Sequence, residues 1–116
     1  IDPSIMLYGL SGSDTIKEAK AIGLQTVQEV FADRTYQSNG QLTPRYLDHA
    51  LITDPIESAK QVLSMVLDQE IKTVDGTMIA VNAETICIHG DHEAAVEIAK
   101  HLFSTLQQYQ IEIKQP

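Results

Sequence analysis

The chain has 116 residues, of which 43% are hydrophobic and 21% are charged, a composition typical of one globular domain rather than a disordered segment. Sixteen Asp and Glu residues oppose eight Lys and Arg residues, and the net charge of −8 argues against a surface that binds nucleic acid. No apolar run approaches the roughly 20 residues of a membrane-spanning helix, and the single Cys87 cannot form an internal disulfide, so we expect a cytoplasmic protein without a membrane anchor.

The first third of the chain alternates between strand and helix patterns. The apolar run IMLYGL at 5–10 predicts a buried strand, and the SGSD segment after it carries the Ser and Asp residues that cap helices. A short helix over about 14–22 follows, with Gly23 as its stop. QTVQEVFA at 25–32 predicts the second strand, and a long polar stretch follows up to residue 54.

The next helix has the clearest start signal in the sequence. Asp54 is a capping residue, Pro55 suits the first helical position, and Glu57 is spaced to complete a capping box. Further along, Asp75-Gly76 stands between two segments rich in β-forming residues, which predicts a hairpin.

The last third predicts a strand, a helix and a short alternating tail. TICIH at 85–89 is the third main strand, the final helix runs over about 91–109, and the tail QIEIKQP is expected as an edge strand. Strands that alternate with helices pair in parallel, so the predicted fold class is α/β.

Polar residues follow two of the predicted strands, where α/β proteins bind their ligands. Asp33 and Arg34 follow the second strand, and His89, Gly90 and Asp91 follow the third. If the two strands are neighbours, these groups converge on one edge of the sheet. We therefore take them, with Arg45 from the long polar stretch, as the candidate site.

Each candidate has a chemical role and a simpler alternative. His89 has an imidazole side chain, a group suited to proton transfer, whereas Asp91 could orient a water or only cap the final helix. Arg34 and Arg45 are suited to hold a carboxylate or phosphate, and Gly90 lets the backbone approach a ligand. His92 is predicted to be a solvated residue of the first helical turn. Nothing in the sequence has zinc-finger spacing, and a His–Asp–His metal site would need His89 and His92 to face the same point.

The segments EVFADRTY, GQLTPR, TVDG and ETICIHGD, in this order and spacing, resemble the C-terminal part of the LamB/YcsF family. The resemblance begins at IDPSIMLYGLSGSD and covers essentially the whole chain. It implies a TIM-like, irregular β/α barrel with parallel strands. Such a barrel needs roughly 200–250 residues, and the family's N-terminal motifs are absent, so we expect residues 1–116 to be one partial domain, the C-terminal half of a barrel.

The resemblance also implies an activity. Family members act with partner subunits B and C to open the lactam ring of 5-oxoproline to glutamate. The reaction is driven by hydrolysis of ATP, which is expected to bind together with Mg²⁺. The resemblance implies that His89 and Asp91 are catalytic and that Asp33 and Arg34 contribute to binding substrate or phosphate. Residue chemistry adds Arg45 and Gly90 to the predicted substrate- or phosphate-binding residues. An isolated half-barrel would expose apolar surface, so we expect self-association or association with another chain.

Two other functions fit the same residues. His and Asp at strand ends would suit a metal-dependent hydrolase of the deacetylase type, although no metal ligand set is predicted here. A fragment of this size could also be a module that contacts other subunits without catalysis.

Overall fold

The computed structural model describes residues 2–116 and has nine helices and strands in this range. Their order alternates as the sequence predicts, with a hairpin inserted before the last strand. The bounds are β1 Met6–Leu10, α1 Asp14–Ala21, β2 Gln25–Phe31, α2 Pro55–Leu63, the π-helical turn η1 Ser64–Asp68, β3 Glu70–Lys72, β4 Met78–Ala80, β5 Thr85–Cys87 and α3 Ala95–Gln108.

The main sheet has three parallel strands in the order β1-β2-β5. The β1–β2 register pairs Leu10 with Glu29, and the β2–β5 register pairs Phe31 with Cys87. The α/β class with parallel strands is therefore confirmed, and the carboxyl ends of all three strands lie at one edge of the sheet. Among the described residues this sheet is open, with β1 and β5 as its outer strands.

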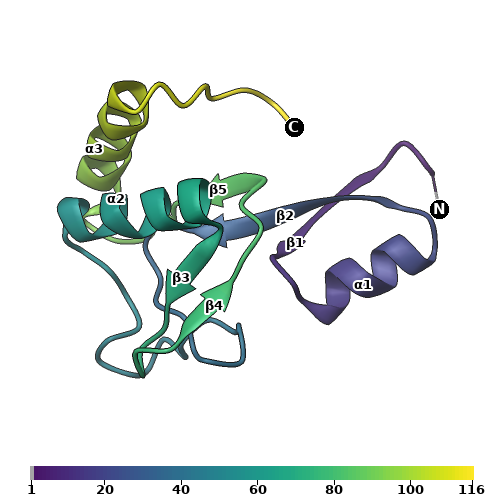
Figure 1. The fold of residues 1–116 in the computed structure, drawn as a ribbon, viewed down its shortest axis with the longest axis horizontal. Coiled ribbons are helices and arrows are strands. Elements are labelled where there is room, and N and C mark those ends of the chain that lie inside the picture. The colour runs from purple at the N-terminus through teal and green to yellow at the C-terminus, as the bar shows by residue number, and fades with distance from the viewer. Residues whose placement is uncertain (1) are drawn as a thin grey trace.

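The helices lie at opposite ends of the sheet, as Figure 1 shows. Helix α1 packs against β1 and β2, and α2 packs against α3 at the other end. The α1 contact is close: a Cβ added to Gly9 on β1 would lie 3.1 Å from Ile16 Cδ1. The larger core lies beneath α2 and α3 and is built from buried apolar residues, among them Val30, Val62, Met65 and Leu102.

The local start and turn signals are confirmed. Ser13 Oγ accepts the Ile16 amide at the start of α1, and Asp54 Oδ1 accepts the Ile56 amide at the start of α2. Glu57 forms an ion pair with Lys60 at 3.0 Å rather than completing a capping box.

The predicted hairpin is also present. Strands β3 and β4 pair antiparallel around a turn in which Gly76 has φ 87°, a left-handed conformation that glycine adopts without strain.

Two predictions in the last third are wrong. Helix α3 begins at Ala95 rather than at residue 91, and its N-cap, Ala94, makes no side-chain capping bond. Asp91 is therefore not a helix cap. The tail after Gln108 forms no strand in the described chain; it leaves the end of α3 and runs above β5 as an extended segment (Figure 1).

Candidate functional site

The site forms where β2 and β5 end at the same edge of the sheet. Because Phe31 pairs with Cys87, the residues two positions beyond each strand, Asp33 and His89, come to lie side by side. Asp33 is completely buried, with 0% of its surface exposed, although it is a carboxylate at the start of a long loop. A buried carboxylate needs several hydrogen-bond donors to offset the loss of water.

Asp33 has three such donors, all from the loop between β5 and α3. The His89 amide donates to Asp33 Oδ2 at 2.7 Å, and His89 Nδ1 lies 2.8 Å from Oδ1. His92 Nε2 lies 2.9 Å from Oδ2. The carboxylate therefore holds two imidazole rings and one backbone amide in a single cluster of Asp33, His89 and His92.

The contacts within the cluster determine which ring nitrogens carry hydrogen. Burial opposes the ionisation of Asp33, but the hydrogen bonds from His92 and from the ring and amide of His89 outweigh it, so the pKa of Asp33 lies below its ordinary value. An ionised Asp33 can only accept, so the ring nitrogens that face it carry hydrogen. A neutral His89 then has its lone pair on Nε2, on the side of the ring away from Asp33.

The His89 ring is held by a second contact. It stacks on Phe31, with ring centroids 5.2 Å apart and planes 8° apart. The side chain remains 22% exposed, so one edge of the ring is open to solvent or a substrate. A carboxylate that orients an imidazole while leaving its other nitrogen free is an arrangement that supports general acid–base chemistry.

Charged residues surround this cluster. Arg45 Nη1 lies 2.7 Å from Asp91 Oδ2 in an ion pair whose side chains are 48% and 57% exposed, and this pair lowers the pKa of Asp91. Arg34 is only 6% exposed; its Nη2 donates to the Thr43 carbonyl at 2.7 Å. Burial and the nearby charge of Arg45 lower the pKa of Arg34. The site thus contains a buried and a half-exposed arginine.

The structure brings most of the predicted residues together. Asp33 and His89 are in direct contact, and Arg34, Arg45 and Asp91 lie within range of one another's charge. Gly90 is exposed, and a Cβ added to it would meet nothing within 4 Å, so its role in binding stays a prediction.

His92 is the residue that the sequence patterns misplace. They predict a solvated helical turn, but the residue lies in the loop before α3 with its ring turned onto Asp33. The available sequence signal for His92 is the pair of histidines in the segment HGDH, because both imidazoles bind the same carboxylate. That acid is Asp33, 56 residues before His89, rather than the neighbouring Asp91.

The described residues contain no group of three or more His, Cys, Asp or Glu side chains arranged to hold a metal ion. No helix within the described range has the length and apolar character needed to cross a bilayer.

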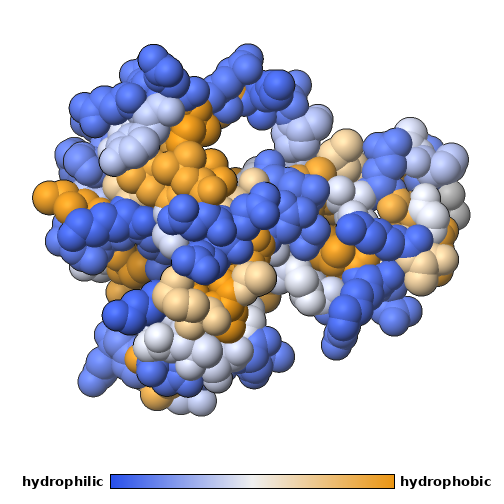
Figure 2. Space-filling model, viewed as in Figure 1, coloured by the Kyte–Doolittle hydropathy of each residue, from blue (hydrophilic) through white to orange (hydrophobic). Residues whose placement is uncertain are grey.

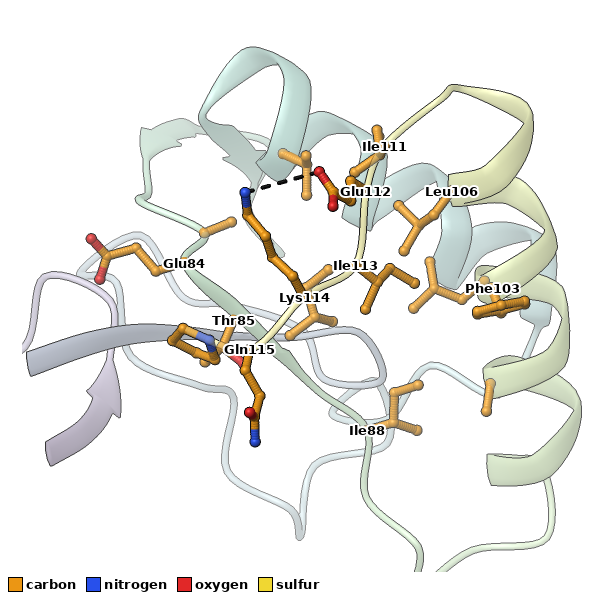
Figure 3. A pocket seen from close by; sticks show the side chains of 16 residues that line it. Glu84, Thr85, Ile88, Phe103, Leu106, Ile111, Glu112, Ile113, Lys114 and Gln115 are labelled. Carbon is orange, nitrogen blue, oxygen red and sulfur yellow. Dashed lines mark ion pairs between the residues drawn. The ribbon is translucent and has the colours of Figure 1, made fainter. Parts of the chain in front are cut away.

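A hollow of about 540 Å³ lies between β5, α3 and the C-terminal tail, and its lining includes no member of the Asp33, His89 and His92 cluster. Figure 3 shows Leu106, Ile111 and Ile113 within it, with the Glu112–Lys114 ion pair at its border. Figure 2 shows apolar surface exposed beneath α3. This apolar groove is suited to contact another apolar surface rather than to carry chemistry.

An α/β fold with a polar site at the carboxyl ends of its parallel strands is a fold class that many enzymes share. The comparison that narrows it is with the LamB/YcsF family, whose model matches residues 1–116. The chain belongs to this family.

The relatives agree with this assignment. The A subunit of 5-oxoprolinase from Geobacillus thermodenitrificans is 52% identical over 98% of this chain and 44% of its own length. The same subunit from Geobacillus kaustophilus is 50% identical over the whole chain and 45% of its own length. The crystal structure of a lactam utilization protein from Thermus thermophilus covers 97% of this chain and 44% of its own, with 39% identity and a TM-score of 0.88. The chain thus spans less than half the length of these relatives.

Proposed function

We propose that this chain is part of the A subunit of a 5-oxoprolinase. The complete enzyme would open the lactam of 5-oxoproline to L-glutamate by ATP-dependent hydrolysis, together with subunits B and C, in the cytoplasm. The support is the 52% identity to a protein of that name and the family match over the full length of the chain. The proposal includes the barrel, of which residues 1–116 would be the C-terminal half.

The observation that carries a hydrolytic function is the bond between the buried Asp33 and His89. Opening a lactam requires a base that activates water and an acid that protonates the leaving nitrogen. His89 can do both through Nε2, because Asp33 holds its Nδ1–H. An amide is a poor electrophile, and phosphorylation of its oxygen would create a good leaving group, which is the chemical reason for ATP.

The remaining residues of the site would bind the charged parts of the substrates. Arg34 and Arg45 are suited to hold the carboxylate of 5-oxoproline or a phosphoryl group. Gly90 would let the backbone approach that group. Asp91 pairs with Arg45 and projects half-exposed at the same edge, where it would position water or the lactam. ATP enters as a substrate with Mg²⁺ on its phosphates, and no residue here is assigned as a ligand of that ion.

The test uses the complete protein together with its partner subunits. His89→Ala and Asp91→Asn should each lower ATP-dependent turnover of 5-oxoproline by about 100-fold or more, the range expected for a general acid–base group. His101→Ala, an exposed histidine on α3, is the matched control and should retain activity. Asp91→Asn and His101→Ala should unfold thermally like the wild type, whereas His89→Ala should be less stable, because the buried Asp33 loses its ring donor. Wild-type turnover in both His89→Ala and Asp91→Asn would refute the site assignment.

The apolar groove favours a second candidate, an interaction module without catalysis. The outer strands β1 and β5 and the groove beside α3 are surfaces that another chain could cover. We therefore retain the prediction that the 116-residue chain associates with itself or with a partner. Light scattering measures this directly, and a stable monomer at high concentration would contradict it.

A further inference from the structure

His92 contacts the same carboxylate as His89 but has no part in the proton transfer proposed above. Its Nε2 lies 2.9 Å from Asp33 Oδ2, and its side chain is only 12% exposed. The other ring nitrogen, Nδ1, is buried and has no partner among the described residues. The contact with Asp33 is therefore the only hydrogen bond that this ring makes within the described chain.

The carboxylate divides its two oxygens unequally. Oδ1 receives His89 Nδ1, while Oδ2 receives both the His89 amide and His92 Nε2. Without His92, every side-chain and backbone donor to the Asp33 carboxylate would come from His89 itself. The position of the Asp33 carboxylate would then depend on His89 alone, the residue that Asp33 is proposed to orient.

This dependence matters because Asp33 is completely buried. Burial favours the neutral acid, and a proton taken up by His89 could then pass to Asp33. Of the hydrogen bonds that oppose burial and lower the pKa of Asp33, the one from His92 has the largest effect. His92 is thus the largest single donor contribution, beside those of His89, that keeps the buried Asp33 ionised.

We infer that His92 is a positioning residue, whose Nε2–H holds the buried Asp33 carboxylate in place for His89. The inference deepens the proposed function and rests on it for the role of His89. His92 itself does not touch the substrate in this assignment, since its free ring nitrogen is buried. It acts on the reaction only through Asp33.

The other charged and titratable groups near Asp33 do not replace His92. Arg34, in the same segment, lies within range of the Asp33 charge, but its hydrogen bond goes to the Thr43 carbonyl. Cys87, at the end of β5, is affected by the same charge. Arg45 and Asp91 form their own pair further out. In the described chain, only the two histidines donate to the Asp33 carboxylate.

The direct test follows the ¹³C signal of the Asp33 carboxyl group against pH in the 116-residue chain. His92→Leu removes the donor, so Asp33 should titrate about 1 pH unit higher than in the wild type. His92→Gln keeps an N–H at a similar reach and should stay near the wild type. His101→Leu is the matched control on the exposed face of α3 and should change nothing.

Each result decides the inference. An unchanged Asp33 titration in His92→Leu would overturn it, and so would an equal shift in His92→Leu and His92→Gln, because the hydrogen bond would then be irrelevant. If His92→Leu does not fold, His92→Asn replaces it, since its shorter amide cannot reach Asp33 from the same backbone position.

Turnover provides the second readout. In the complete enzyme, we compare the profiles of kcat/KM against pH. As the pH is lowered, kcat/KM of His92→Leu should begin to fall at a higher pH than kcat/KM of the wild type, and His92→Gln should restore the wild-type profile. The two proposals fail in different ways. If His89→Ala keeps wild-type turnover while the Asp33 titration responds as expected, the proposed function fails and the link between His92 and Asp33 stands. If the titration does not respond, the present inference fails whatever the turnover.

Discussion

Two strand-to-helix junctions at the same edge of the sheet are built in opposite ways. Between β1 and α1 the chain turns within three residues, and Ser13 caps the helix with its own side chain. Between β5 and α3 it needs seven residues, and the N-cap of the helix, Ala94, makes no side-chain capping bond. This second junction is held by Asp33, which is far away in the sequence.

The difference separates a structural turn from one that builds the candidate site. At the β1–α1 turn the amides bond neutral partners: Ser13 Oγ accepts the Ile16 amide, and Gln28 Oε1 accepts the Gly12 amide. The β5–α3 loop instead directs one amide and two imidazoles onto a buried carboxylate, an arrangement that is costly unless every donor is in place. Substitutions at each junction and a change of pH test this contrast.

Asp33→Asn should have the largest effect. The amide of Asn has one acceptor oxygen instead of two, so at least one of the three donors from the loop loses its partner. We expect a loss of about 2 kcal/mol in the free energy of unfolding and a loss of turnover at least as large as that of His89→Ala. Urea unfolding measures the first effect, and the ATP-dependent assay measures the second.

Hydrogen exchange shows where this damage lies. In Asp33→Asn the His89 amide should lose protection, while the amides of residues 11–13 should exchange as in the wild type. Asp48→Asn, at an exposed position of the same long loop, is the matched control and should change neither junction. Equal loss of protection at both junctions would contradict the contrast drawn here.

Acid should weaken the β5–α3 junction through the same carboxylate. The pKa of Asp33 is lower in the folded chain than its ordinary value, so the ionised group stabilises the fold above about pH 4. This contribution disappears as the pH falls through the lower folded-state pKa. Thermal unfolding between pH 6 and pH 2 should therefore show a steeper loss of stability for the wild type than for Asp33→Asn. If stability falls with pH equally in both proteins, Asp33 has no role in the acid response.

The contrast also explains what the sequence could predict. The α/β class, the parallel strands, both capped helix starts and the hairpin at Gly76 depend on nearby residues, and patterns of nearby residues predict them. The same patterns place the start of α3 four residues early, because Asp91 looks like a cap. Its carboxylate pairs instead with Arg45, 46 residues away in the sequence, which no local pattern shows.

The sequence also predicts one part of the candidate site and not another. Strand order brings Asp33 and His89 to one edge, so their proximity follows from the α/β fold. The orientation of His92 does not, because it depends on how the β5–α3 loop folds over Asp33. A single histidine in a polar loop gives no sign of whether its ring points outward or inward.

Ser13→Ala should be the local counterpart of Asp33→Asn, with a smaller effect. Loss of the cap should lower the free energy of unfolding by about 1 kcal/mol, because the Ile16 amide loses its acceptor. Ser13→Asp should restore most of this loss, since Asp is an equally good capping residue. Turnover and the protection of the His89 amide should stay at wild-type values, and a fall in either would mean that the two junctions are coupled.

Cys87 gives the most sensitive measure of the second junction, because it is the last residue of β5. Burial, together with the negative charges of Glu29 and Asp33, raises the pKa of its thiol to about 11. Since the thiolate is the reactive form, iodoacetamide at pH 7 should modify the folded chain far more slowly than the chain in urea. Asp33→Asn removes one of these charges and loosens the adjoining loop, so alkylation should become faster. Ser13→Ala should leave the rate unchanged, because the packing of α1 is against β1 and β2.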